Sequence, residues 1–143
     1  MNKLLVVGIT GMLAGGFALA AVAQTHSAQD EVNTAHAHAM MAQSATTVAM
    51  AQTHLHHVIN CLVGPNGTGF DTKAGDPCKG QGNGAIPDSA SDAALHTKLQ
   101  AALTDAETGV KASDLKAAQA SAAKAAASLQ ATPAQKASGG YSW

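Results

Sequence analysis

A long run without glycine or proline, from His26 to Leu62, constrains the fold more than any other feature of the sequence. Asp30 and Glu31 near its start suit the positive end of a helix dipole. Apolar residues recur along the run at steps of three and four, as in a helix with one buried face. The run therefore predicts a helix. The β-branched residues within 46–48 mark where it would bend, but nothing in the run forces a break.

Two stripes follow from this periodicity, because residues three or four apart share a helix face. The first stripe carries donor side chains, namely His36, Met40, Gln43, Thr47, Met50, His54, His57 and Cys61. The second is a core seam of Met41, Ala45, Val48, Leu55, Ile59 and Leu62. His38 lies at the head of the core seam, and both His38 and His56 lie off the donor stripe. The helix is thus expected to present one dry face and one face of potential ligands.

A glycine-rich segment, residues 63–87, follows the run and predicts a loop. Loops of this length inside a compact domain are usually functional or tied down. Cys61 and Cys78 can supply the tie, and in an exported protein two cysteines are expected to form a disulfide. Closing the loop in this way would stabilise the fold by about 3 kcal/mol. Cys61 could bind a metal only as a free thiol.

The rest of the domain, residues 88–132, predicts a helical hairpin. Asp88 or Ser89 can cap a helix that runs to Lys111, and Ser113 can cap another that ends before Pro133. We therefore expect an all-α fold, a small antiparallel bundle of about three helices spanning residues 24–132. Alanine dominates its apolar positions and buries little area, so a homo-oligomer or a bound ligand is a possible supplement.

Residues 1–23 have the pattern of a secretory signal peptide, with Lys3, an apolar stretch and the small residues of 21–23. A retained membrane anchor is the alternative, but the glycines in the apolar stretch and the polar switch at Gln24 argue against it. We expect cleavage near Ala23, a periplasmic or secreted protein, and a mature form that is not embedded in the membrane. Residues 133–143 are expected to be a flexible tail.

The charge balance excludes one class of partner. The chain has a formal net charge of −1 and contains no arginine. It therefore lacks the basic patch that nucleic acid or an anionic membrane requires.

The histidines point to a metal ion, because neutral imidazole is a common ligand and thioether sulfur favours soft ions. Met50, His54 and His57 can converge from one helix face, and His36 with Met40 can do the same further up. In a continuous helix the levels of residues 36 and 54 would lie about 27 Å apart. The pattern thus predicts two sites, a bent helix, or ligands from elsewhere.

His96 is the best candidate for completing such a site from another helix, and a second subunit is the alternative. Copper, nickel or zinc would suit these donors. Binding is expected to weaken below about pH 6, where imidazole gains a proton.

In overall type the chain resembles the small exported helical proteins whose histidine-rich faces buffer copper, nickel or zinc. The resemblance rests on the leader and on five histidines: His36, His38, His54, His56 and His57. Three other interpretations stay open. The histidines can be merely solvated on a structural module that recognises partners through its disulfide loop; the bundle can hold a non-covalent haem; or it can house a redox or hydrolytic metal centre. The sequence contains no C-x-x-C-H motif for covalent haem and no nucleophile motif, so no enzymatic activity is predicted.

Overall fold

The computed structural model describes residues 28–130. The expected leader (residues 1–23) and the expected tail (residues 133–143) lie outside this range. Within it the chain forms five helices and no strand, which confirms the all-α class. In chain order they are α1 (Ala28–Gln43), α2 (Val48–Val63), α3 (Ala85–Asp88), α4 (Ala93–Val110) and α5 (Leu115–Leu129). No helix among these residues is long and apolar enough to cross a membrane.

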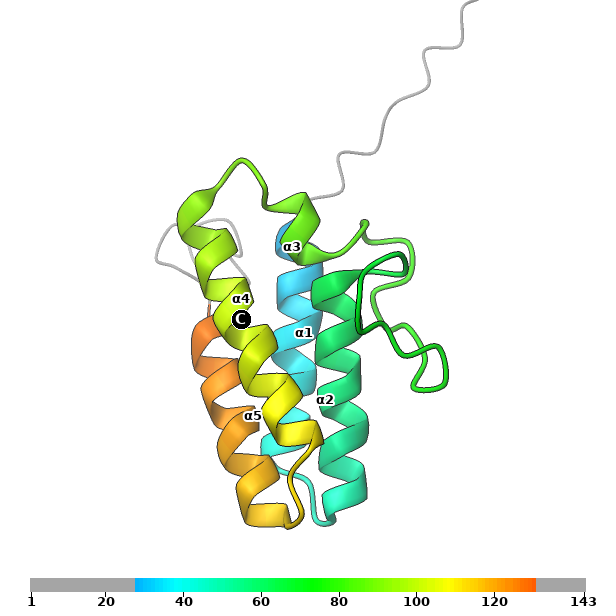
Figure 1. The fold of residues 1–143 in the computed structure, drawn as a ribbon, viewed down its shortest axis with the longest axis vertical. Helices are drawn as coiled ribbons and strands as arrows, with labels where there is room; N and C mark the ends of the chain where they lie inside the picture. The colour runs from blue at the N-terminus through cyan, green and yellow to red at the C-terminus, as the bar shows by residue number, and fades with distance from the viewer. Residues whose placement is uncertain (1–27, 131–143) are drawn as a thin grey trace, which may run out of the picture.

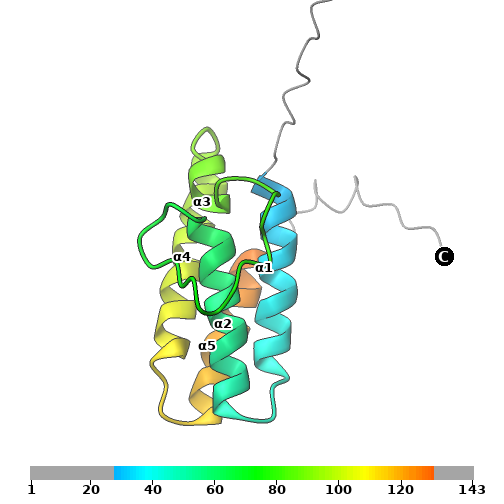
Figure 2. The ribbon, with the colours of Figure 1, turned by 90° about the vertical axis from the view of Figure 1, so that its right-hand side faces the viewer.

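The four longer helices lie side by side and alternate in direction, with the short α3 near one end (Figure 1). The α1–α2 hairpin packs against the α4–α5 hairpin, and the turns of both hairpins lie at the same end of the bundle (Figure 2). The bundle therefore has one long helix more than the three that the sequence predicts.

The extra helix arises because the run from His26 to Leu62 forms two helices, with the break next to the β-branched residues of 46–48 where the sequence marks a bend. The chain turns back between Gln43 and Val48. Ser44 bonds back to the Met40 carbonyl through both its amide and its hydroxyl, and the Thr47 hydroxyl accepts from the Met50 amide at 3.1 Å. Thr47 thus caps a new helix. The turn lets α1 and α2 bury their apolar faces together, which one straight rod could not do.

The boundaries in the second half also differ from the prediction. Asp88 ends the short α3 rather than capping a long helix, and the caps of α4 and α5 are Asp92 and Asp114. Each of these two carboxylates accepts a hydrogen bond from the amide three residues on, at 3.0 Å and 2.9 Å. The observed caps thus lie beyond the predicted Asp88 or Ser89 and one residue after the predicted Ser113, and their negative charge also suits the helix dipole.

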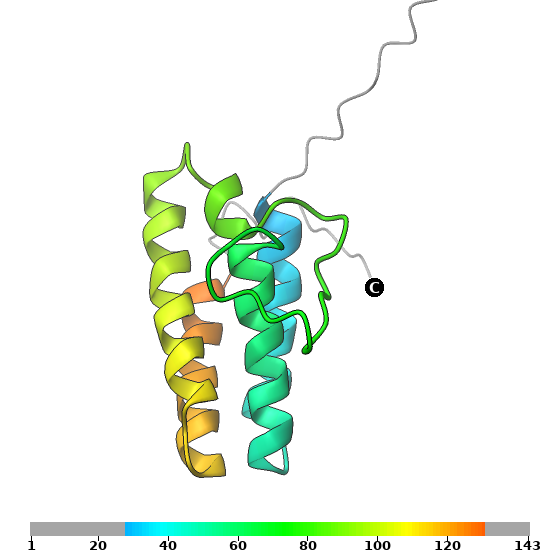
Figure 3. The same cartoon turned by 45° about the vertical axis from the view of Figure 1, so that its right-hand side comes forward.

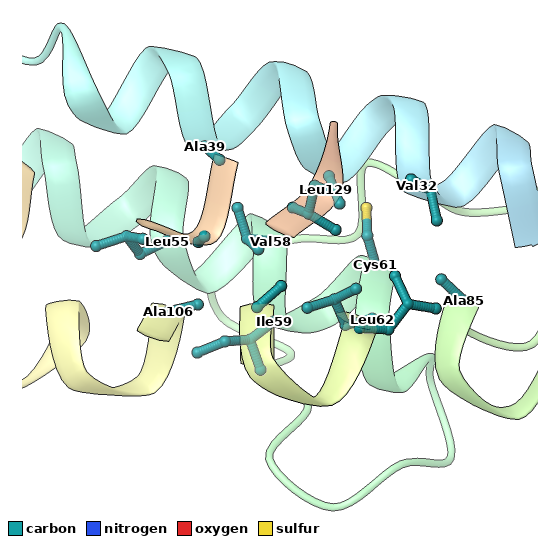
Figure 4. Close-up of a cluster of buried hydrophobic side chains, with 14 of the residues drawn as sticks. Val32, Ala39, Leu55, Val58, Ile59, Cys61, Leu62, Ala85, Ala106 and Leu129 are labelled. Atoms are coloured by element: carbon teal, nitrogen blue, oxygen red, sulfur yellow. The ribbon is translucent and has the colours of Figure 1, made fainter. Parts of the chain in front are cut away.

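The core lies between the two hairpins and is built from a few aliphatic side chains among many alanines. Leu55 and Val58 of α2 meet Val32 of α1 and Ala106 of α4 in one cluster (Figure 4). Small side chains let the helix backbones approach closely, so the core gains contact with little apolar area per residue.

Residues 64–84 join α2 to α3, and the Cys61–Cys78 disulfide confirms the expected cross-link, with a Cα–Cα distance of 5.2 Å. Gly64 ends α2 with a φ of 71°, a conformation that glycine adopts without strain. The segment then crosses over α2 toward α1 (Figures 2 and 3). Near α1, the Thr34 hydroxyl donates to Gln81 at 2.9 Å. The segment therefore covers the open side of the α1–α2 hairpin.

Candidate metal centre

Three histidine rings meet on the α1–α2 hairpin. His38 comes from α1, and His54 and His57 come from adjacent turns of α2. The Nδ1 atom of His38 lies 3.2 Å from Nδ1 of His54 and 3.2 Å from Nδ1 of His57. One ring nitrogen from each residue lies within 4.8 Å of the other two, and all three residues are half-buried. Among residues 28–130 this is the one group of three or more His, Cys, Asp or Glu side chains close enough to share an ion.

The spacing of these nitrogens is that of ligands around one cation. Zinc–imidazole bonds of about 2.0–2.1 Å at a tetrahedral angle place two nitrogens about 3.3 Å apart. The two 3.2 Å separations around His38 nearly match this edge length. Two of the three nitrogen pairs therefore already have the spacing of ligands around one small transition-metal ion, and the third pair lies within 4.8 Å.

A backbone carbonyl selects the tautomer of His57. Nε2 of His57 lies 2.7 Å from the carbonyl oxygen of Ala74. A carbonyl only accepts hydrogen bonds, so Nε2 carries the proton and the neutral ring leaves Nδ1 bare. Without a cation, the three Nδ1 atoms have room for only one proton, which lies in one of the two short contacts made by His38. A metal ion would satisfy all three lone pairs, and the Ala74 bond is the outer-shell contact that orients such a ligand.

The surroundings favour the neutral rings of His38 and His54. Burial, together with the neighbouring His57 and His54, lowers the pKa of His38 from 6.5 to about 4. Burial also lowers the pKa of His54, with His57 as the second cause. Imidazole binds metals only when deprotonated. The rings of His38 and His54 are thus ready to bind at neutral pH.

The segment that carries Ala74 is fixed by α2 itself. The buried Asn60 side chain donates to the carbonyls of Asp71 and Gly75, at 2.8 Å and 2.6 Å, and accepts from the Asp71 amide at 2.8 Å. The disulfide at Cys61 holds the far side of the same segment. Three positions near the end of α2, His57, Asn60 and Cys61, therefore provide a candidate ligand, a side-chain clamp and a covalent tie.

Three residues near the cluster have other surroundings. His56 points to Asp71, with 3.5 Å between Nδ1 and a carboxylate oxygen. Cys61 is in the disulfide and so is not a free thiol ligand. Met50 precedes His54 by one helical turn and is exposed.

The remaining predicted ligands lie elsewhere. His36 is two residues from His38, so it projects from a different side of α1, where its Nε2 is buried without a hydrogen-bond partner. Met40 shares that side and is exposed. His96, which was expected to complete the site, instead places Nδ1 3.2 Å from the Ile86 carbonyl and 3.4 Å from the Ser89 hydroxyl. It thus links α4 to the end of α3.

The third ligand of the cluster was among the predicted histidines but not in the predicted grouping. In a single continuous helix, His38 lies at the head of the core seam, well away from His54 and His57. The signal that could have found it is Thr47, a residue type that often caps helices, with potential ligands both before and after it in the sequence. Folding the sequence about this position brings His38 opposite His54.

Comparisons with protein-family models, with curated proteins and with solved structures find no match for this chain. The candidate function is therefore derived from the side chains themselves.

Proposed function

We propose that the chain is an exported, non-enzymatic protein that binds one transition-metal ion through His38, His54 and His57. The ion would be copper, nickel or zinc, which imidazole ligands suit. The convergence of the three ring nitrogens within 4.8 Å carries this proposal. The 2.7 Å contact from Ala74 to His57 supports it, since bound histidines usually donate their other N–H to such a partner.

The half-buried state of the three residues favours a buffering, carrying or sequestering role. A structural zinc site is closed by four protein ligands, whereas three ligands leave a position for water or for a donor from another molecule. An ion held in this way can be exchanged. The exported location is supported by the leader-like residues 1–23 and is consistent with the disulfide.

Calorimetric titration of the purified protein with Cu(II), Ni(II) and Zn(II) tests the proposal. We expect one ion per chain for the wild type. His38→Ala should weaken the affinity by at least about a hundredfold, more than the loss of an outer-shell partner typically costs. His56→Ala is the matched control, because this ring lies on the same helix as His54 but faces Asp71. Equal loss in both variants, or no binding by the wild type, would overturn the proposal.

Acidification should release the ion. The pKa of His38 is lowered to about 4 and that of His54 is also lowered, so protons displace the ion at a lower pH than they would from free imidazole. We expect binding to persist at about pH 6 and to be lost as the pH falls toward 4. This refines the value of about pH 6 that the sequence alone predicts.

A further inference from the structure

Two exposed methionines lie beside the histidine cluster. Met41 on α1 is 48% exposed and Met50 on α2 is 47% exposed. Together with Met40 they are the large hydrophobic residues exposed within residues 28–130. Their exposure costs apolar burial in a bundle whose core has few large side chains, so packing does not account for them.

The helix register places both methionines one turn from a candidate ligand. Met41 follows His38 by three residues, and Met50 precedes His54 by four, so each methionine shares a face with a candidate ligand. Because α1 and α2 are antiparallel, both steps lead toward the same end of the hairpin (Figure 2). The 3.2 Å contact between His38 and His54 fixes this pairing of the two helices. The methionines thus extend the cluster by one turn toward the connecting turn.

The three histidines and the two methionines offer only uncharged nitrogen and sulfur donors. Thioether sulfur is neutral and polarizable and selects Cu(I), whereas carboxylate oxygens suit harder ions. The metal-binding group found within residues 28–130 is composed of histidines alone. The nearby carboxylate of Asp71 is paired with His56 instead. An uncharged N/S donor set is better matched to a monovalent soft ion than to a hard divalent one.

We propose that the site takes Cu(I), and that Met41 and Met50 supply the thioether donors that make it selective for this ion. This inference rests on the proposed function, since the methionines extend the site that His38, His54 and His57 form. The long, flexible methionine side chains allow the sulfur atoms to reach an ion one turn away.

The test measures Cu(I) affinity under anaerobic conditions, by competition with a chromogenic Cu(I) chelator, and Zn(II) affinity by calorimetry. The test variant is the pair Met41→Leu and Met50→Leu, which keeps size and apolarity but removes the sulfur atoms. Met40→Leu is the matched control. Met40 is 46% exposed and adjacent to Met41 in sequence, but it projects about 100° further around α1.

We expect the double variant to lose Cu(I) affinity by about tenfold or more while its Zn(II) affinity stays within about twofold of the wild type. The Met40→Leu control should change neither affinity. Far-UV circular dichroism should show unchanged helix content in all variants, because the substituted side chains are half exposed.

The outcomes separate the two proposals. Zn(II) binding that requires His38, together with Cu(I) affinity that the double variant leaves unchanged, would overturn the role of the methionines and keep the histidine site. A wild type that binds Zn(II) but not Cu(I) would do the same. A wild type that binds neither ion would overturn both.

Discussion

The two hairpins of the bundle are stabilised in different ways. In the α4–α5 hairpin every buried residue is alanine, leucine or glycine. The α1–α2 hairpin buries Glu31 and Asn60 as well, contains the disulfide cysteine Cys61, and brings three imidazoles into contact. Both hairpins pack apolar groups into the shared core, and the α1–α2 hairpin adds directed polar contacts and a covalent tie.

By this comparison the α4–α5 hairpin is a scaffold, and the α1–α2 hairpin carries the candidate metal site. Polar groups in a protein interior are stabilising only when every member has a partner, and such groups then fix one geometry. Asn60 meets this condition, and it sets the position of the segment that contacts His57. We therefore expect changes around α2 to affect stability and metal affinity together, and changes in the α4–α5 hairpin to affect stability alone.

Removal of the disulfide should have the largest effect. The double substitution Cys61→Ser and Cys78→Ser opens a link that spans 17 residues. We expect the free energy of unfolding to fall by about 3 kcal/mol, measured by urea denaturation. Metal affinity should fall by about tenfold, because the Ala74 carbonyl is no longer held against His57.

The control for this experiment is Lys79→Ser, at an exposed position next to Cys78. It should change neither quantity. If the disulfide variant loses stability but keeps its full metal affinity, the segment does not position His57, and the proposed coupling between loop and site is wrong.

The next effect concerns the buried acid of the same hairpin. Glu31 is 1% exposed, and its Oε1 accepts from the Gly84 amide at 2.7 Å while Oε2 receives no hydrogen bond. Burial, together with the nearby Asp88 and Asp76 and against the Gly84 hydrogen bond, raises its pKa from 4.5 to about 7. The folded state thus keeps this proton in a pH range where the unfolded state has released it.

Between pH 4.5 and about 7 the folded state therefore binds more protons, and its stability falls as the pH rises. Glu31→Gln should remove this loss, on the order of 2 kcal/mol between pH 4.5 and 8. The depressed pKa of His38 acts in the opposite direction between about pH 4 and 6.5, so the comparison must be made between variant and wild type at each pH. The control is Asp30→Asn, at an exposed neighbouring position, which should leave the dependence of stability on pH as in the wild type. If Glu31→Gln also shows the wild-type dependence, Glu31 is not the group that causes the loss of stability.

The smallest effect is expected in the α4–α5 hairpin. A Cβ atom on Gly109 would lie 2.6 Å from Cδ1 of Leu55 and 2.9 Å from Cβ of Ser121. Because Leu55 is fully buried, it cannot move away freely. Gly109→Ala should therefore destabilise the bundle by about 1 kcal/mol, after the gain in helix propensity is subtracted from the cost of overpacking.

Metal affinity should change little in this variant, since Leu55 and His54 project about 100° apart from α2. Thr108→Ala, at an exposed neighbouring position, is the control for the stability measurement. A loss of metal affinity comparable to that of the disulfide variant would show that the two hairpins are not separable.

The sequence predicts the parts of this molecule that local patterns determine. Helical periodicity gives the all-α class, and two cysteines around a glycine-rich segment give the disulfide. The spacing of His54 and His57 places these residues on one helix face. Each of these inferences needs only residues close in sequence or a single covalent pair.

The missed features depend on contacts between distant segments. The turn before Val48 contains no glycine or proline, so only the β-branched residues of 46–48 and the cap at Thr47 mark it, and threonine occurs in many helices without capping. The grouping of His38 with His54 follows from that turn. The contact from Ala74 to His57 involves a backbone carbonyl. Because every residue has one, no sequence pattern predicts this contact.

The covalent closure of the segment over His57 has a consequence for timing. Before the cystine forms, a newly made chain in a reducing cytosol has its thiols free and the segment that carries Ala74 less firmly held. Such a chain would be a weak competitor for cytosolic metal ions. Under the export proposed above, oxidation outside the cytosol would complete both the fold and the ligand geometry, so the protein would reach its full metal affinity only after the disulfide has formed.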